Sequence, residues 1–103
     1  MNRSFPYALL VGFRDGLARA LARRLEAAGF VVVRVAHGLA AQDEALRLGV
    51  SLVVTSNDLF SMEKNAIAET ASLLGAPIVS ASREEDLDRV LAHFSFRRLR
   101  AAS

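Results

Sequence analysis

Residues 7–35 read YALLVGFRDGLARALARRLEAAGFVVVRV: an apolar run, a polar turn, a helical stretch that ends in glycine, and a second apolar run. Two further apolar runs lie at residues 51–54 and 77–79, and a helical stretch follows each of them. Strands joined by helical connections of this length run parallel. The sequence therefore predicts an α/β fold, a three-layer α/β/α sandwich with a four-stranded parallel sheet built from four βα units. We expect the strand order 2-1-3-4.

Helix boundaries are marked by polar residues and glycines. Asp15 is well placed as the N-cap of the first helix, because its carboxylate can accept hydrogen bonds from free backbone N–H groups. The second helix is expected at residues 39–48 and the third from about Ser61 to the glycine at position 75. Ser82 and Glu85 form the serine and glutamate of a capping box, which predicts the start of a last helix.

The second apolar run, residues 31–35, holds four valines and one charged residue, Arg34. An almost continuous apolar run is typical of a strand that is buried on both faces. We therefore expect this strand to be buried on both faces and to lie at or near the centre of the sheet.

Length and composition indicate one compact domain over residues 1–103, with a short basic tail at residues 97–103. The chain has no cysteine, which excludes disulfides, thiolate zinc sites and thiol chemistry. Its apolar runs are too short to span a bilayer, and its first residues do not resemble a secretion signal. We expect a cytoplasmic protein with no membrane segment, no metal and no cofactor.

The formal net charge of +2 comes from many arginines that are nearly balanced by acids. The basic patches are therefore local, and three arginines gather in the tail, Arg97, Arg98 and Arg100. Three charges release only about three counterions on binding a nucleic acid. We predict weak, sequence-independent nucleic-acid binding at most.

Ligands of open parallel sheets bind beyond the carboxyl ends of the strands, where the winding direction reverses. Here that rule points to the loops after the first and third strands. Polar residues at these and the other strand ends are candidates for binding a small ligand, an anion or a nucleotide: Gly12, Phe13, Arg14, Asp15, Gly16, His37, Thr55, Ser56, Asn57, Asp58, Ser80 and Ser82. Asp15 and Asp58 are alternatively a helix cap and a loop residue, and His37 is alternatively a histidine at the sheet edge.

The first loop resembles that of short-chain dehydrogenases, because Gly12 and Gly16 have the spacing of that family's first two glycines. Ala18 stands at the third glycine. In the family, this turn brings backbone N–H groups to a pyrophosphate. The catalytic tyrosine and lysine segment of the family has no counterpart, since the only tyrosine is Tyr7 in the first strand.

Residues 7–82 resemble a response-regulator receiver domain, on the apolar first strand, the helix that ends in Gly29 and Phe30, and the valine-rich second strand. The resemblance implies a flavodoxin-like fold. In the family, an acidic pair after the first strand binds magnesium, an aspartate at the end of the third strand accepts phosphate, and a lysine ends a fifth strand. Here Gly12 and Phe13 replace the acidic pair, residues 55–57 hold the acceptor position, and Asp58 comes slightly too late. In the family a serine or threonine ends the fourth strand, and Ser80 or Ser82 could supply that hydroxyl here; the fifth strand is missing.

These departures predict a degenerate receiver that is not phosphorylated. The leading hypothesis is a small non-catalytic regulatory or protein-interaction module, with a protein partner or a second copy bound near Phe94, Phe96 and Leu99. A small-ligand or anion-binding protein is the alternative, and weak nucleic-acid binding by the basic tail is a further one.

Overall fold

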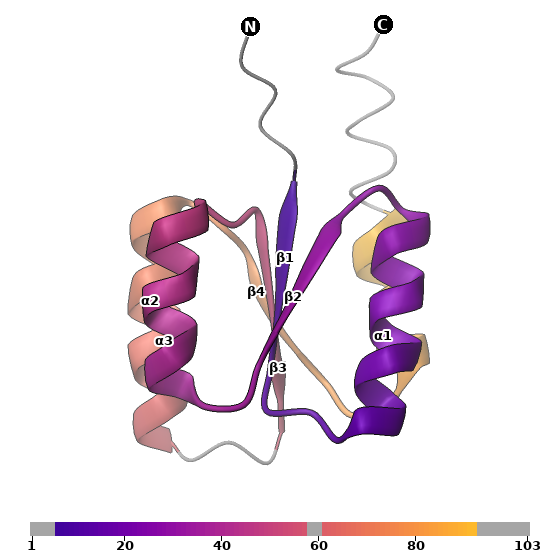
Figure 1. Cartoon of the computed structure of the whole chain (residues 1–103), viewed down its shortest axis with the longest axis horizontal. Helices are drawn as coiled ribbons and strands as arrows, with labels where there is room; N and C mark the ends of the chain where they lie inside the picture. The colour runs from indigo at the N-terminus through magenta and orange to yellow at the C-terminus, as the bar shows by residue number, and fades with distance from the viewer. Residues whose placement is uncertain (1–5, 58–60, 93–103) are drawn as a thin grey trace, which may run out of the picture.

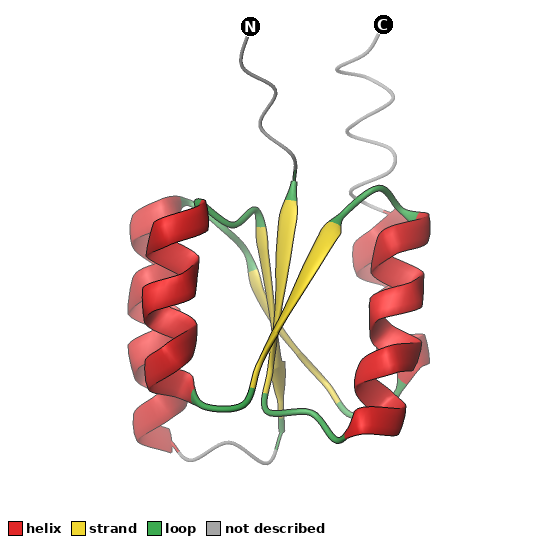
Figure 2. Cartoon of the chain, in the orientation of Figure 1, coloured by secondary structure: helices red, strands yellow, loops and turns green. Residues whose placement is uncertain are grey.

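The computed structural model describes residues 6–57 and 61–92. Four strands alternate with helical segments along the chain (Figures 1 and 2). The elements are β1 (Tyr7–Val11), α1 (Asp15–Ala27), β2 (Val31–Val35), α2 (Gly38–Leu48), β3 (Leu52–Ser56), α3 (Ser61–Leu74), β4 (Ile78–Ala81) and the 3-10 helix η1 (Glu84–Leu87). The chain continues from η1 as α-helix through Ala92.

All four strands are parallel, and their order in the sheet is β2-β1-β3-β4. Helices α2 and α3 cover one face of the sheet, while α1 and the segment that begins at η1 cover the other (Figure 1). The predicted three-layer sandwich and its strand order are therefore confirmed.

The hydrophobic core has two halves, one on each face of the sheet, because side chains alternate along each strand. On the α1 face, Leu10 and Val54 pack with Leu21, Leu25 and Leu87. On the other face, residues from β1 and β3 pack with α2 and α3: Leu9, Val11, Val53, Ala41, Ala45, Ile67 and Ala71. Strands β1 and β3 are thus buried on both sides.

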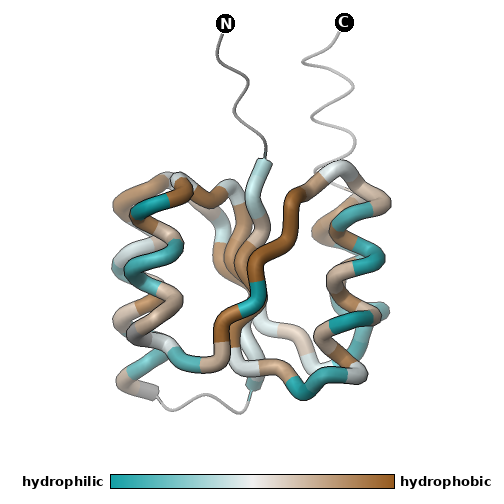
Figure 3. The backbone as a smooth tube through the Cα atoms, in the orientation of Figure 1, coloured by the Kyte–Doolittle hydropathy of each residue, from teal (hydrophilic) through white to brown (hydrophobic). Residues whose placement is uncertain are grey.

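The valine-rich strand β2 is not buried on both faces as expected. In the part of the chain that the structure describes, it lies at an edge of the sheet and pairs only with β1. Val31 is 39% exposed, and Arg34 is exposed as well. Figure 3 shows the brown run of β2 interrupted by a teal, hydrophilic stretch. Apolar composition alone does not distinguish a central strand from an edge strand, because strand order depends on the crossover connections.

Helix ends agree with the glycine signals. Helix α2 ends at Gly49, whose φ of 67° is the left-handed conformation that favours glycine. Helix α3 ends just before Gly75. The predicted third and fourth strands began one residue too early and ended two residues too early. Both extend into polar residues, because Thr55 and Ser56 of β3 pair with Ser80 and Ala81 of β4.

Two predicted caps are wrong. Asp15 is the first helical residue of α1, and Arg14 occupies the N-cap without a side-chain cap hydrogen bond. At the last helix, Asp86 takes the place expected for Glu85. Its Oδ2 accepts hydrogen bonds from the backbone N–H groups of Ser82 at 2.8 Å and Arg83 at 3.1 Å.

Arg24 of α1 binds the last helical segment, residues 84–92. Its Nε and Nη2 donate to Glu84 Oε1 at 3.2 and 2.8 Å, and its Nη1 donates to Asp88. Leu87 of this segment is fully buried in the core on the α1 face. None of the described helices combines the length and apolar character that crossing a bilayer requires.

Helices α2 and α3 meet so closely at Gly38 that a side chain there has no room. A Cβ atom at Gly38 would lie 2.7 Å from Glu63 Cβ and 3.3 Å from Glu63 Cα. We expect Gly38→Ala to lower the free energy of unfolding by about 1–3 kcal/mol, because the helices must separate. At Gly16, in the first turn of α1, a Cβ would meet nothing within 4 Å. Gly16→Ala is the matched control and should stabilise by up to ~1 kcal/mol. Urea denaturation checks both, and equal effects at the two positions would contradict the close approach.

Acid should weaken the cap of the last segment. Hydrogen bonds from the backbone of Ser82 and Arg83 hold the pKa of Asp86 below its usual range. A folded-state pKa below the unfolded value adds stability above the unfolded pKa, about 3.9, and this stability is lost as the pH falls through the folded pKa. We expect Asp86→Asn to flatten the decline of unfolding free energy below about pH 4, measured by urea denaturation at several pH values. An unchanged slope would show that Asp86 is not a source of this pH dependence.

Candidate functional site

The winding of the sheet reverses between β1 and β3, and a pocket of about 220 Å³ opens there at the carboxyl ends of the strands. We call it the switch-point pocket. Its lining comes from the loop after β1, the first turn of α1, and the ends of β3 and β4: Gly12, Phe13, Arg14, Leu17, Ser56, Asn57, Ala81 and Ser82. Six of the candidate residues from the sequence are thus brought together in one place.

The loop after β1 takes its shape from Gly12 and Phe13. Gly12 has a φ of 80°, which few other residues adopt, and its N–H donates to Val35 O at 2.9 Å. Phe13 is half-buried and packs against the core on the α1 face. The loop is therefore anchored on both sides, and the next residue, Arg14, is exposed at the mouth of the pocket.

The switch-point pocket has a mixed lining: Phe13, Leu17 and Ala81 are apolar, whereas Arg14, Ser56, Asn57 and Ser82 are polar or charged. Among the described residues, none that lines it is acidic. Arg14 forms no ion pair with any residue in the described part of the chain. Asn57 is exposed, and its backbone carbonyl accepts a hydrogen bond from Lys64 Nζ at 3.3 Å. Two positive charges, on Arg14 and Lys64, therefore lie at or beside this pocket.

Thr55 and Ser80 do not line the switch-point pocket. Thr55 is only 2% exposed, and its hydroxyl lies 3.3 Å from the hydroxyl of Ser80 across the β3–β4 pair. The Thr55 hydroxyl also lies 3.4 Å from the carbonyl oxygen of Val79, to which it donates. These two candidates therefore bond to each other within the sheet. Ser80 borders a separate open hollow with Glu85, Asp86 and Arg89.

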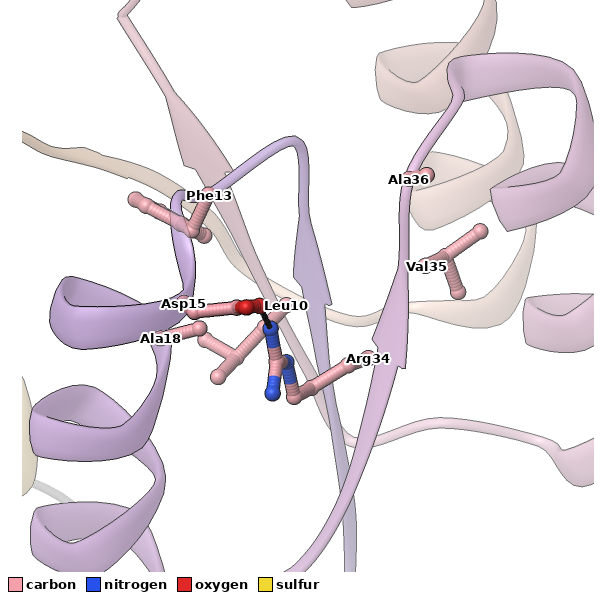
Figure 4. Close-up of a pocket in the computed structure, with 7 residues that line it drawn as sticks. All are labelled: Leu10, Phe13, Asp15, Ala18, Arg34, Val35 and Ala36. Atoms are coloured by element: carbon pink, nitrogen blue, oxygen red, sulfur yellow. Dashed lines mark hydrogen bonds and ion pairs between the residues drawn. The ribbon is translucent and has the colours of Figure 1, made fainter.

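A second pocket, of about 360 Å³, lies on the other side of the loop, between α1 and β2. Figure 4 shows its lining residues, among them Phe13, which contributes to both pockets. Arg34 Nη2 donates to Asp15 Oδ1 at 2.6 Å across this second pocket. The Arg34 hydrogen bond and charge hold the pKa of Asp15 below its usual range. Asp15 thus joins α1 to the edge strand, and it does not line the switch-point pocket.

The remaining candidates lie elsewhere. Gly16 is exposed in the first turn of α1 and lines neither pocket. His37 is exposed at the N-cap of α2 and lines neither pocket. Asp58 lies outside the described residues, as do the expected interface residues Phe94, Phe96 and Leu99 and the tail arginines.

Sequence reasoning missed Leu17, Ala81, Arg34 and Lys64. Leu17 and Ala81 are apolar and carry no chemical signal, although their positions one turn into a helix and at a strand end place them beside the loops. Arg34 carried a signal, because it is the one charged residue in an apolar strand. Among the described residues, no group of three or more histidines and acids is arranged to hold a metal ion.

No protein-family model and no curated protein matches this sequence. Among solved structures, the chain is similar to a de novo designed Rossmann 2x3 fold protein whose solution structure was determined by NMR. The TM-score is 0.56 and the sequence identity 10%, and the match covers 85% of this chain and 70% of the designed one. The similarity shows a Rossmann-like α/β fold, and at this identity it shows the fold alone.

Proposed function

We propose that this chain is a small non-catalytic regulatory module on a receiver-like scaffold, and that its switch-point pocket binds a small anion. The observation that carries the proposal is the set of polar groups in the pocket: Arg14, Asn57 and Ser82 lie beside the backbone of Gly12 on a partly apolar lining. None of the described lining residues is acidic. In a receiver domain, the corresponding crevice holds a covalently bound phosphoryl group. In this proposal, the crevice of the present chain binds a free anion instead.

The first turn of α1 supports an anion over a cation. The first backbone N–H groups of a helix have no partner within the helix and carry partial positive charge. Among the described residues, no side chain caps these groups in α1: the N-cap Arg14 makes no side-chain cap hydrogen bond, and the carboxylate of Asp15 is bound to Arg34. An anion near Arg14 would meet both the guanidinium and the positive end of the helix.

The size of the pocket limits the ligand. At about 220 Å³ it is smaller than the roughly 300–1,000 Å³ typical of sites for drug-sized molecules. A phosphate, a carboxylate or the phosphoryl end of a small metabolite fits this volume better than a whole dinucleotide does.

Catalysis has little support at this pocket. Phosphoryl transfer to a receiver needs a carboxylate nucleophile and a divalent ion held by acids. At the start of the first loop, Gly12 and Phe13 offer neither, and the hydroxyl of Thr55 is buried against β4. The proposed role is therefore binding without turnover.

Acetyl phosphate distinguishes this module from an active receiver. We expect the intact mass to stay unchanged after incubation with acetyl phosphate and magnesium, because the metal-binding acids are missing from the first loop. A stoichiometric adduct that hydroxylamine removes, located at Asp58 by peptide mapping, would overturn the non-phosphorylated reading.

Titration with inorganic phosphate tests the anion site directly. In amide NMR spectra we expect saturable shifts at Gly12, Asn57 and Ser82. Arg14→Gln should weaken binding about tenfold, since one charge-assisted hydrogen bond is worth ~1.5 kcal/mol. Arg19→Gln is the matched control, because Arg19 is exposed on the same helix and does not line the pocket. Equal weakening by both variants would indicate a general charge effect and contradict a site at Arg14.

A further inference from the structure

Within residues 6–57 and 61–92, strand β4 is an open edge of the sheet, because it pairs only with β3. The Val53 N–H donates to the carbonyl of Pro77 at 3.0 Å, so residue 77 directs its backbone toward β3. In a parallel pair, alternate residues direct their N–H and C=O groups to the same neighbour. Val79 therefore also bonds to β3, and the backbone groups of Ile78 and Ser80 face outward.

The two edges of the sheet differ in charge. Edge strand β2 carries Arg34, and a charged side chain on an edge opposes pairing with another strand. Strand β4 reads IVSA and carries no charge, and Ile78 is 37% exposed. Only the β4 edge therefore resembles a surface that another strand can join.

The topology does not favour a strand of the same chain at this edge. The segment after β4 crosses the face that α1 covers, whereas the connections that add β3 and β4 cross the opposite face. A parallel strand placed outside β4 by a crossover on the α1 face would have a left-handed connection. Such connections make up only about 2% of cases.

Charges beside the edge fit a second copy of this chain. Glu85 and Arg89 border the same hollow as Ser80, and neither forms an ion pair within the described residues. A two-fold axis reverses the direction of the helical segment, so that its acidic start faces the basic Arg89 of the other copy. Because Glu85 precedes Arg89 along this segment, the same surface of two copies is complementary in charge when the copies run antiparallel.

We propose that two copies of this chain pair through β4, antiparallel about a two-fold axis, and form one continuous eight-stranded sheet. In the register that uses every outward group, Val79 lies at the axis and Ile78 lies opposite Ser80 of the partner subunit. Glu85 lies near Arg89 of the partner subunit. Because β4 has only four residues, we expect the pairing to bury less than the ~1,200–2,000 Å² of a stable interface and the dissociation constant to lie in the micromolar range.

Sedimentation velocity over a range of concentrations tests the dimer. We expect the wild-type chain to associate reversibly, Ile78→Lys to weaken association at least tenfold, and Val31→Lys to leave it unchanged. The two substitutions are matched, because each replaces a branched residue of similar exposure at the first position of an edge strand. A wild-type monomer up to about 0.5 mM, or equal effects of the two variants, would overturn the proposal.

Two further measurements do not depend on how well Ile78→Lys folds. Arg89→Glu should weaken the dimer at least threefold, and the double variant Glu85→Arg, Arg89→Glu should restore it, because the exchanged charges are complementary again. Amide hydrogen exchange should slow at Ile78 and Ser80 as concentration rises, while exchange at Val32 and Arg34 of the β2 edge stays constant. Failure of the double variant to recover, or protection at β2 instead of β4, would refute this interface. Neither result depends on anion binding.

Discussion

The parallel pairing of β1 with two neighbours is the constraint on which the rest of the structure depends. β1 contacts β2 on one side and β3 on the other, and Ala8 to Val11 are fully buried. The connection from β1 to β2 moves one way across the sheet, and the connection from β2 to β3 moves back the other way past β1. With right-handed crossovers, their helices α1 and α2 lie on opposite faces. The switch-point pocket is the gap between the loop after β1 and the ends of β3 and β4.

The charge of the switch-point pocket depends on which nearby polar groups are bound to other parts of the protein. Asp15 is paired with Arg34, the hydroxyl of Thr55 with β4, and Asp86 with the backbone at Ser82 and Arg83. The acids nearest the strand ends, within the described residues, are therefore engaged in structural contacts. Arg14 at the mouth of the pocket, with Lys64 nearby, gives the opening its positive character, and this balance supports an anion as ligand.

The sequence was a good guide wherever structure depends on neighbouring residues. β1 and β2 have their predicted bounds, and α2 and α3 end at the glycines that mark them. It was a poor guide wherever a partner comes from another element. Asp15 matched an N-cap locally, but Arg34, 19 residues away, binds it instead. Glu85 matched a capping box, but the 3-10 turn brings Asp86 to the backbone N–H groups.

The candidate site shows the same division. The rule that ligands bind where winding reverses identified the loops at Gly12 and Asn57, because strand order depends on connection length and handedness. It did not separate Ser82, which lines the pocket, from Ser80, which does not, since that distinction depends on the pairing of β4 with β3.

The contacts of Arg24 have a consequence for the order of folding. They join residues 60 and 64 positions apart in the chain, and closing a long loop costs entropy before its contacts form. The segment that Arg24 holds is also the one whose Asp86 fixes the backbone at Ser82, one wall of the pocket. That wall is thus expected to be completed late in folding, after β1, α1 and β2 have assembled. A ligand that binds this pocket would therefore distinguish the fully folded chain from a folding intermediate in which only the last helical segment has not yet packed.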